Sequence, residues 1–185
     1  MKIYIFGFAV MALLLVAFSA CDSTSMGSGN GGSGSSSSTE PNWGVQTKTT
    51  GCVAQNALQD SACTPGAIFP NVTKEQVCVS GYAGSVRNVP QSEKNKVFAE
   101  YSVTKHLPGE YEVDHLVSLE LGGSNDIANL WPEAATPKPG FHEKDQVENY
   151  LHNQMCSGKI TLKEAQIEIA TNWLTVYNHM SQSGG

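Results

Sequence analysis

The chain has 185 residues, of which 11 are Lys or Arg and 17 are Asp or Glu, and its formal charge at pH 7 is −6. This acidic balance excludes tight binding to a polyanion through overall charge, so any contact with nucleic acid must be local. It leaves open enzymes and binding modules that carry a small basic region of their own.

The first twenty residues are typical of a secretory signal sequence. A single Lys precedes an apolar run from Ile3 to Phe18, which is too short for a membrane span of about 20 residues. The sequence FSAC, which ends at Cys21, resembles a bacterial lipobox. We therefore interpret residues 1–20 as a lipoprotein signal peptide and Cys21 as a lipidated N-terminus, with an ordinary secreted protein as the alternative. This predicts a lipoprotein anchored in the bacterial cell envelope, facing the periplasm or the surface.

Residues 21–40 form the next segment, which is rich in Gly and Ser. Thirteen of the 18 residues from 23 to 40 are Gly or Ser, and such a composition cannot bury a core. We interpret this segment as a flexible tether. Residues 41–185, about 145 in number, are long enough for one domain with its own core.

Four cysteines fall in this predicted domain: Cys52, Cys63, Cys78 and Cys156. An even number in an exported chain indicates two disulfides, for which three connectivities exist. No spacing is Cys-x-x-Cys, which argues against a structural zinc knuckle. We take Cys63–Cys78 with Cys52–Cys156 as a working pairing, since it closes one short loop and ties the N-terminal part to a late helix. The other pairings stay open.

The first half of the domain gives weak signals for secondary structure. Residues 41–90 are rich in Gly, Pro and Thr with short apolar runs near Ile68 and Cys78, which predicts mostly loop with short strands. Ser92 is typical of a helix N-cap, and a helix of about ten residues is expected after it. From Tyr111 an alternating segment predicts a bent strand or hairpin that ends at a Gly-Gly pair.

The second half predicts two helices. Residues 141–156 carry apolar side chains at helical spacing, and Gly158 is a natural terminator. Thr161 and Glu164 have the spacing of a capping box, which predicts a final helix. The apolar stripe of that helix indicates structural packing rather than a functional site.

An Asp-His pair stands out within the predicted strand. Neighbouring side chains of a strand point to opposite faces, so Asp114 and His115 share a direction only where the strand bends. The Gly-Gly pair allows the chain to reverse. Beyond it, Asn125, Asp126 and Asn129 supply side chains that bond to nearby backbone and fix a loop.

These residues resemble the His-Asn-His (HNH) endonucleases. The shared pattern is Asp-His-Leu, a Gly-Gly turn, Asn-Leu-Trp-Pro, and a helix with a His near its start, and exported bacterial members add Lys-Asp-x-x-Glu-Asn and Cys-Ser-Gly-Lys. The resemblance covers most of residues 62–173. It implies an α+β fold with a ββα-metal module, additional helices and a loop-rich N-terminal part stabilised by disulfides.

The resemblance also implies a role for individual residues. Asp114 and His142 would ligate one divalent metal ion, His115 would be the general base, and Asn129 would orient His115 by fixing the loop. His142 follows Asn129 at a longer spacing than in compact family members, and His152 is the competing position. His106 and His179 have no motif support and are interpreted as surface histidines.

The implied reaction is hydrolysis of a phosphodiester by water, with a metal ion stabilising the developing charge. Carboxylate and imidazole ligands accept Mg²⁺, Mn²⁺, Ni²⁺ or Zn²⁺, and Mg²⁺ is the ion that we expect. Arg87, the only arginine, and Lys144 are the candidate phosphate-binding residues. We expect a sequence-nonspecific endonuclease that acts on DNA, with RNA as a second substrate, outside the cytoplasm.

One alternative belongs to a different functional class. The acidic charge balance is compatible with a lipoprotein that keeps the HNH fold as a binding or surface-exclusion module without catalysis. Peptide hydrolysis is less favoured, because the sequence lacks the His-Glu-x-x-His motif of common zinc proteases.

Overall fold

The computed structural model describes residues 40–183. The predicted signal peptide, the lipidation site Cys21 and all of the tether except Glu40 lie outside the described residues. Among the helices of residues 40–183, none combines the length and apolar character needed to cross a membrane.

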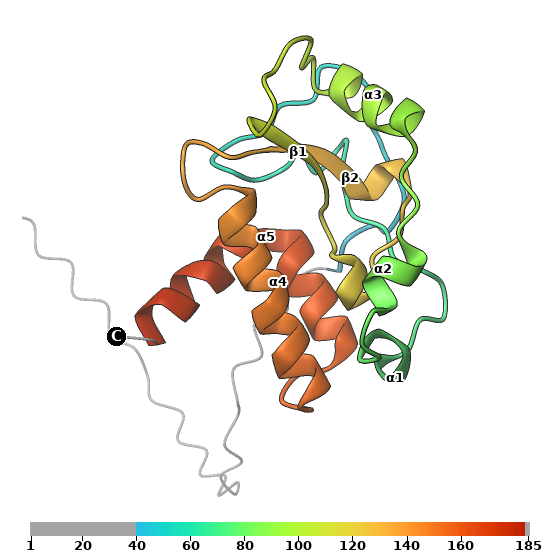
Figure 1. Ribbon diagram of the computed structural model, residues 1–185, viewed down its shortest axis with the longest axis vertical. Helices are drawn as coiled ribbons and strands as arrows, with labels where there is room; N and C mark the ends of the chain where they lie inside the picture. The colour runs from blue at the N-terminus through green and yellow to red at the C-terminus, as the bar shows by residue number, and fades with distance from the viewer. Residues whose placement is uncertain (1–39, 184–185) are drawn as a thin grey trace, which may run out of the picture. The chain divides into compact units, whose positions relative to one another are not determined.

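The described chain mixes helices with one small antiparallel sheet, which confirms the predicted α+β class (Figure 1). The sheet has two strands, and the helices and 3-10 turns precede, interrupt and follow it. The elements in chain order are α1 (Lys74–Val77), α2 (Tyr82–Val86), α3 (Gln91–Glu100), β1 (Tyr111–His115), η1 (Leu119–Leu121), η2 (Ile127–Asn129), β2 (Leu130–Ala134), α4 (Phe141–Cys156) and α5 (Leu162–Ser183).

The N-terminal part is mostly loop, as predicted, but its short strands are absent from residues 40–90. Ile68 makes only an isolated bridge to Gly123, and Cys78 caps the short helix α1 instead of lying in a strand. Helix α3 forms where a helix was expected, although its N-cap is Pro90 and Ser92 lies inside the first turn.

Strand β1 pairs with β2, and the register sets Glu112 opposite Glu133 and Asp114 opposite Trp131. The second strand was not predicted. It contains a proline and is buried along nearly its whole length, so it lacks the alternation that marks a half-exposed strand. The predicted hairpin within residues 111–121 is therefore corrected: the chain turns through η1 and η2 before it pairs.

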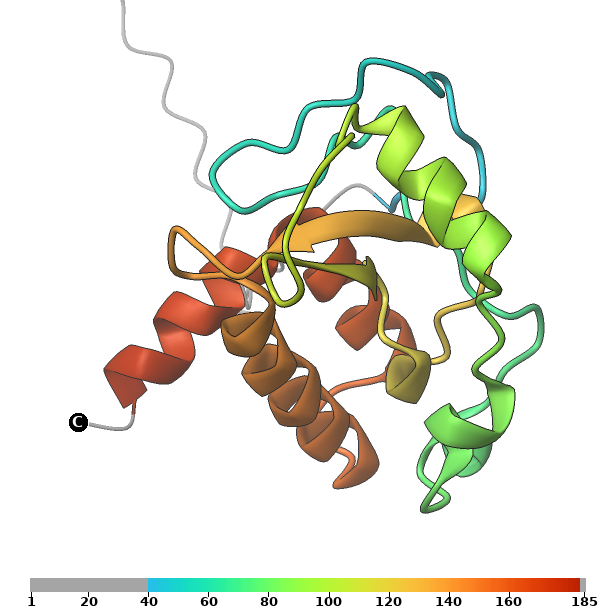
Figure 2. The ribbon, with the colours of Figure 1, turned by 45° about the horizontal axis from the view of Figure 1, so that its top comes forward.

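Two layers of helix flank the hairpin. Figures 1 and 2 show α3 along one side of β1 and β2, with α4 and α5 on the other side. Helix α4 has the predicted bounds, and Gly158 follows it with a left-handed φ of 80°. The capping box before α5 is present, since Thr161 and Glu164 exchange side-chain-to-backbone hydrogen bonds of 2.6 and 3.1 Å.

The main core lies between the hairpin and these last two helices. Its buried side chains include Trp131 from β2, Val147 and Leu151 from α4, and Ile169 and Trp173 from α5. Burying such large apolar side chains contributes about 1.5–3 kcal/mol each. This core fixes α4 against the hairpin.

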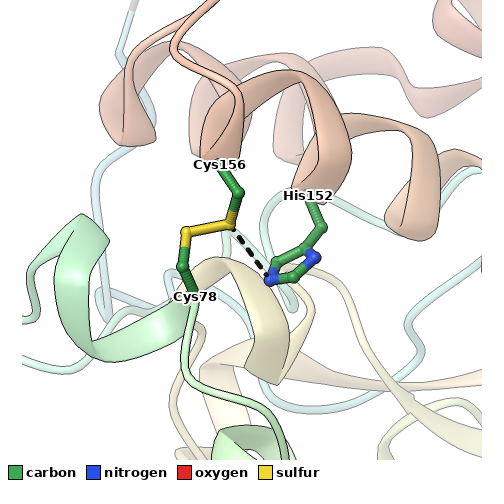
Figure 3. Close-up of side chains that lie close together, drawn as sticks. All are labelled: Cys78, His152 and Cys156. Carbon is green, nitrogen blue, oxygen red and sulfur yellow. Dashed lines mark hydrogen bonds between the residues drawn. A yellow bond between two sulfur atoms is a disulfide. The ribbon is translucent and has the colours of Figure 1, made fainter.

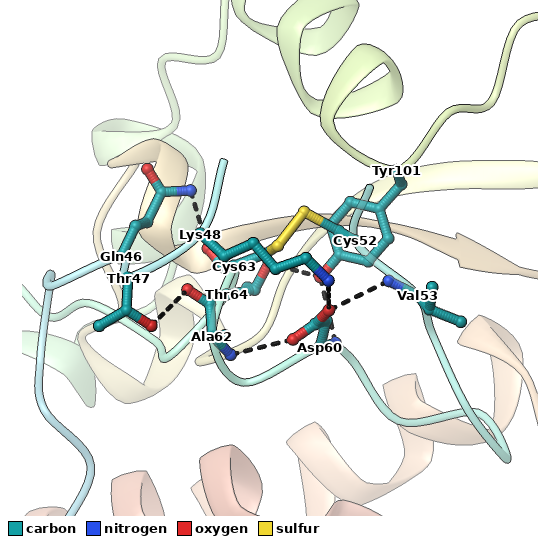
Figure 4. Close-up of polar contacts among 10 residues, drawn as sticks. All are labelled: Gln46, Thr47, Lys48, Cys52, Val53, Asp60, Ala62, Cys63, Thr64 and Tyr101. Carbon is teal, nitrogen blue, oxygen red and sulfur yellow. Dashed lines mark hydrogen bonds and ion pairs between the residues drawn. A yellow bond between two sulfur atoms is a disulfide. The ribbon is translucent and has the colours of Figure 1, made fainter. Parts of the chain in front are cut away.

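The four cysteines form two disulfides, as predicted, but the working pairing is wrong. Cys52 is bonded to Cys63, and Cys78 to Cys156. The segment between Cys52 and Cys63 folds back on itself because Asp60 accepts hydrogen bonds from Lys48 and from two backbone N–H groups of that segment (Figure 4). The second bond joins the end of α1 to the end of α4.

Candidate functional site

The two faces of the hairpin receive different side chains from β1. Side chains alternate along a strand, and residues directly opposite in an antiparallel pair share a face. The register therefore places Glu112, Asp114 and Glu133 on one face and Val113 and His115 on the other. Asp114 meets α4 through Lys144, whereas His115 lines a pocket between β1 and α3.

A hydrogen-bond chain fixes the tautomer of His115. The amide oxygen of Asn125 accepts from the backbone N–H of Asn88 at 3.0 Å, and its amide nitrogen donates to the carbonyl of Val86 at 2.8 Å. The Asn125 oxygen lies 3.2 Å from Nε2 of His115. Because this oxygen only accepts, Nε2 must carry the hydrogen, which leaves Nδ1 as the basic nitrogen of the neutral ring.

Burial keeps the imidazole neutral. The side chain of His115 is nearly inaccessible, and burial lowers its pKa to about 4, although the charge of Asp114 opposes the shift. Near pH 7 the ring is therefore an acceptor of protons. This is the protonation state that a general base requires before the reaction.

Asn129 fixes the loop that follows β1. Its amide oxygen accepts from the N–H of Val117 and of Ala67, and its nitrogen donates to the carbonyls of Val117 and Ser124. The side chain has no exposed surface. The predicted loop contact is thus present in the structure, while its catalytic importance stays a prediction.

Gly123 makes this arrangement sterically feasible. A Cβ atom at this position would lie 1.8 Å from the carbonyl oxygen of Val117 and 3.0 Å from the side-chain nitrogen of Asn129. Any side chain here would push the loop away from Asn129. The Gly-Gly pair seen in the sequence therefore allows a close approach as well as a turn.

Lys144 lies at the centre of a buried charged cluster on the opposite face. Its ammonium group donates to Asp114 at 2.6 Å, to the carbonyl of His115 at 2.8 Å, and to Glu148. These three bonds use all three donors of the group. Burial alone would lower the pKa of Lys144, but the charges of Asp114 and Glu148 raise it above its ordinary value.

Glu133 completes this cluster from β2. Its side chain is buried, with 1% exposure. If Glu133 and Asp114 are both ionised, each can only accept a hydrogen bond, and neither carboxylate oxygen of Glu133 has a partner. Burial raises the pKa of Glu133 well above the ordinary value, with Asp114 adding to the shift. A protonated Glu133 resolves the conflict because it can donate to Asp114.

The predicted phosphate-binding role of Lys144 is therefore corrected. A side chain with 0% exposure whose three donors are all occupied does not reach a phosphate in this fold. Sequence reasoning missed that Lys144 and Glu148 are four residues apart on one helix, a spacing that brings opposite charges together.

The predicted metal ligands do not belong to any group of three close donors in the described residues. His142 is an exposed residue in the first turn of α4, beside Phe141, and Asp114 is bound by the Lys144 ammonium. Within residues 40–183, no group of three acidic, His or Cys donor atoms within 4.8 Å of one another includes Asp114, His115 or His142. An ammonium group against the carboxylate repels a second cation, so these residues do not fit a divalent ion in the observed arrangement.

Two groups of potential donors exist in the part of the chain that the structure describes, and both contain a disulfide. One is formed by Cys52, Asp60 and Cys63, and the other by Cys78, Cys156 and His152. Figure 3 shows the second group, in which Nε2 of His152 lies 3.4 Å from the sulfur of Cys156. Disulfide sulfurs are not thiolates, so these groups lack the usual sulfur ligands of a metal site. His152 packs here and does not line the pocket that contains His115.

The pocket on the His115 face has a volume of about 390 Å³. Its lining includes Arg87, for which substrate binding stays a prediction, together with Lys94, Phe98, His106 and Tyr111. Sequence reasoning missed the last four. The loop that brings His106 back to α3 has no distinctive sequence signal, so this grouping is visible only in the folded chain.

Comparisons of the chain with protein-family models, with curated proteins and with solved structures find no match. The functional conclusions therefore rest on the residues of this chain and on their arrangement.

Proposed function

We propose that this protein is a sequence-nonspecific endonuclease that hydrolyses phosphodiester bonds of DNA or RNA outside the cytoplasm. The HNH-like sequence pattern and the order of β1, β2 and α4 support this proposal. The single observation that carries it is the placement of His115, hydrogen-bonded to Asn125, in a pocket that also contains Arg87. An export signal and a lipid anchor at Cys21 belong to the same proposal.

The chemistry assigned to these groups is proton transfer and charge stabilisation. Nδ1 of His115 removes a proton from a water molecule as the water oxygen attacks phosphorus. The bond from phosphorus to the 3′ oxygen breaks, and the leaving oxygen takes a proton from solvent. Arg87 and Lys94 neutralise the charge that grows on the phosphate oxygens.

No step is assigned to a metal ion, because the predicted ligands do not fit one. Asn125 and Asn129 act through His115: the first sets its tautomer, and the second holds the loop that follows it. The cluster around Lys144 has no substrate contact in this scheme and holds β1 on α4.

Cleavage of plasmid DNA, single-stranded DNA and RNA by the purified protein tests the proposal. Each substrate is incubated with Mg²⁺, with Mn²⁺ and with EDTA. We expect cleavage products from the unaltered protein, and a loss of rate of about 10²- to 10⁴-fold for His115→Ala. His152→Ala is the matched control, since that ring packs against the Cys78–Cys156 disulfide.

Two results would contradict the proposal. One is the absence of cleavage of all three substrates under every condition, and the other is equal activity of His115→Ala. Binding of nucleic acid without cleavage would instead favour the predicted alternative, a binding module that lacks catalysis.

A further inference from the structure

One wall of the His115 pocket is aromatic. The rings of Phe98 and His106 are stacked, with centroids 4.5 Å apart and an angle of 27° between their planes. Tyr111 meets His106 edge-on, with centroids 6.1 Å apart. His106 is exposed, so the stack with Phe98 supports a ring that remains accessible from the solvent side.

The same pocket carries charges that suit a phosphate. Arg87 is exposed and Lys94 is half-buried on α3. Glu112 alternates with His115 along β1, but it is exposed and also borders the pocket; partial burial raises its pKa, with Asp114 and Asp145 adding to the shift. The pocket therefore carries two cations and one carboxylate, and the raised pKa of that carboxylate makes it easier to protonate.

The size of the pocket limits what can enter. A volume of about 390 Å³ falls in the range of small-molecule sites, roughly 300–1,000 Å³. Bases inside a duplex present their edges to a protein, whereas an unpaired base also offers its faces for stacking. An aromatic wall beside two cations therefore matches a nucleotide whose base is free to leave the stack.

We propose that this pocket binds one unpaired nucleotide of a single-stranded nucleic acid, with its base stacked on His106 beside Tyr111 and its phosphate held by Arg87 and Lys94. The inference rests on the proposed function, because it names the class of substrate that the same pocket would bind. It assigns a base-stacking role to His106, which sequence reasoning treated as a surface residue.

A binding experiment with the full-length protein tests this assignment. The His115→Asn variant is titrated with an eight-nucleotide oligothymidylate, and separately with the same strand paired to its complement. We expect the single strand to bind at least about tenfold more tightly than the duplex. Thymidine 3′,5′-bisphosphate, which contains no phosphodiester, is titrated against the protein with His115 intact, so that the test does not depend on the folding of that variant.

Added substitutions locate the binding. His106→Ala and Tyr111→Leu should each weaken binding of the single strand and of the bisphosphate by about five- to tenfold. Tyr150→Leu is the matched control, because Tyr150 is 39% exposed on α4 and does not line the pocket. It should leave both affinities unchanged.

The inference is overturned if the duplex binds as tightly as the single strand. It is also overturned if His106→Ala and Tyr111→Leu both leave the affinity within roughly twofold of the parent protein. A protein that cleaves duplex DNA without any preference for single strands removes this inference and leaves the proposed function intact. A protein that binds single strands through His106 but cleaves nothing removes the proposed function and leaves this inference intact.

Discussion

The two faces of strand β1 carry ionisable groups in opposite situations. On the α4 face, Asp114 meets Lys144 and Glu148 in a buried cluster that satisfies the ammonium group internally. On the α3 face, His115 and Arg87 border a pocket that opens to solvent. Unusual pKa values occur on both faces, so a perturbed pKa alone does not identify a functional site. The open pocket beside the perturbed group separates the two.

Removing the internal cation should have the largest effect on stability. Lys144→Met leaves Asp114 and Glu148, whose side chains are only 17% and 14% exposed, without their partner, and we expect a loss of about 3–5 kcal/mol in the free energy of unfolding. Urea denaturation measures it. Lys96→Met is the control, since Lys96 is 65% exposed in its ion pair with Glu93 and should change stability by less than about 0.5 kcal/mol. Similar stabilities for the two variants would refute the structural role assigned to the charged cluster on the α4 face.

The loop contact of Asn129 affects both faces, because it holds the chain that leaves His115. Asn129→Ala should cost about 2–3 kcal/mol, since buried N–H and carbonyl groups of Val117 lose their partner. Cleavage should fall as well, although Asn129 does not line the pocket. The cleavage rate is measured well below the melting temperature of the variant, so that a lower rate does not reflect unfolding. A fully retained rate would show that the loop does not position His115.

Arg87 offers the contrasting change on the open face. Arg87→Gln should slow cleavage by about 10- to 150-fold, since a charge-assisted contact to phosphate contributes roughly 1.5–3 kcal/mol. The free energy of unfolding should stay within about 0.5 kcal/mol, because Arg87 is exposed. Arg87→Lys should retain part of the rate. An unchanged rate for Arg87→Gln would remove Arg87 from the substrate-binding set.

The smallest expected effect is the change in melting temperature that a metal ion causes on the α4 face. In Lys144→Ala the carboxylates of Asp114 and Glu148 lose their cation beside Glu133, so Mn²⁺ should bind there and raise the melting temperature by about 2–4 °C. The unaltered protein should shift by less than about 1 °C, because Lys144 already holds Asp114. An equal shift in both proteins would contradict the exclusion of a cation from this cluster by Lys144.

Local signals in the sequence were enough for part of this fold. The bounds of α4 follow from helical spacing and the glycine after it, and α5 begins at the capping box of Thr161 and Glu164. Each of these signals is contained within a few residues. Strand β2 was missed because Pro132 and uniform burial conceal it, and only its pairing with β1 defines it.

The candidate site divides in the same way. His115 and Asn129 could be recognised from a linear pattern, since both lie in the segment that turns between the two strands. Lys144 was misread because its burial depends on how α4 packs against β1, which no local spacing reveals. His106 and Tyr111 join Phe98 only through the loop after α3, so their grouping is a property of the tertiary structure.

A crystal structure of the His115→Asn variant with bound oligothymidylate tests the central claim most directly. The account predicts a phosphate within hydrogen-bonding distance of Arg87, adjacent to position 115, with one base stacked on His106. An oligonucleotide bound on the α4 side of the hairpin, or on a surface that leaves this pocket empty, would contradict it.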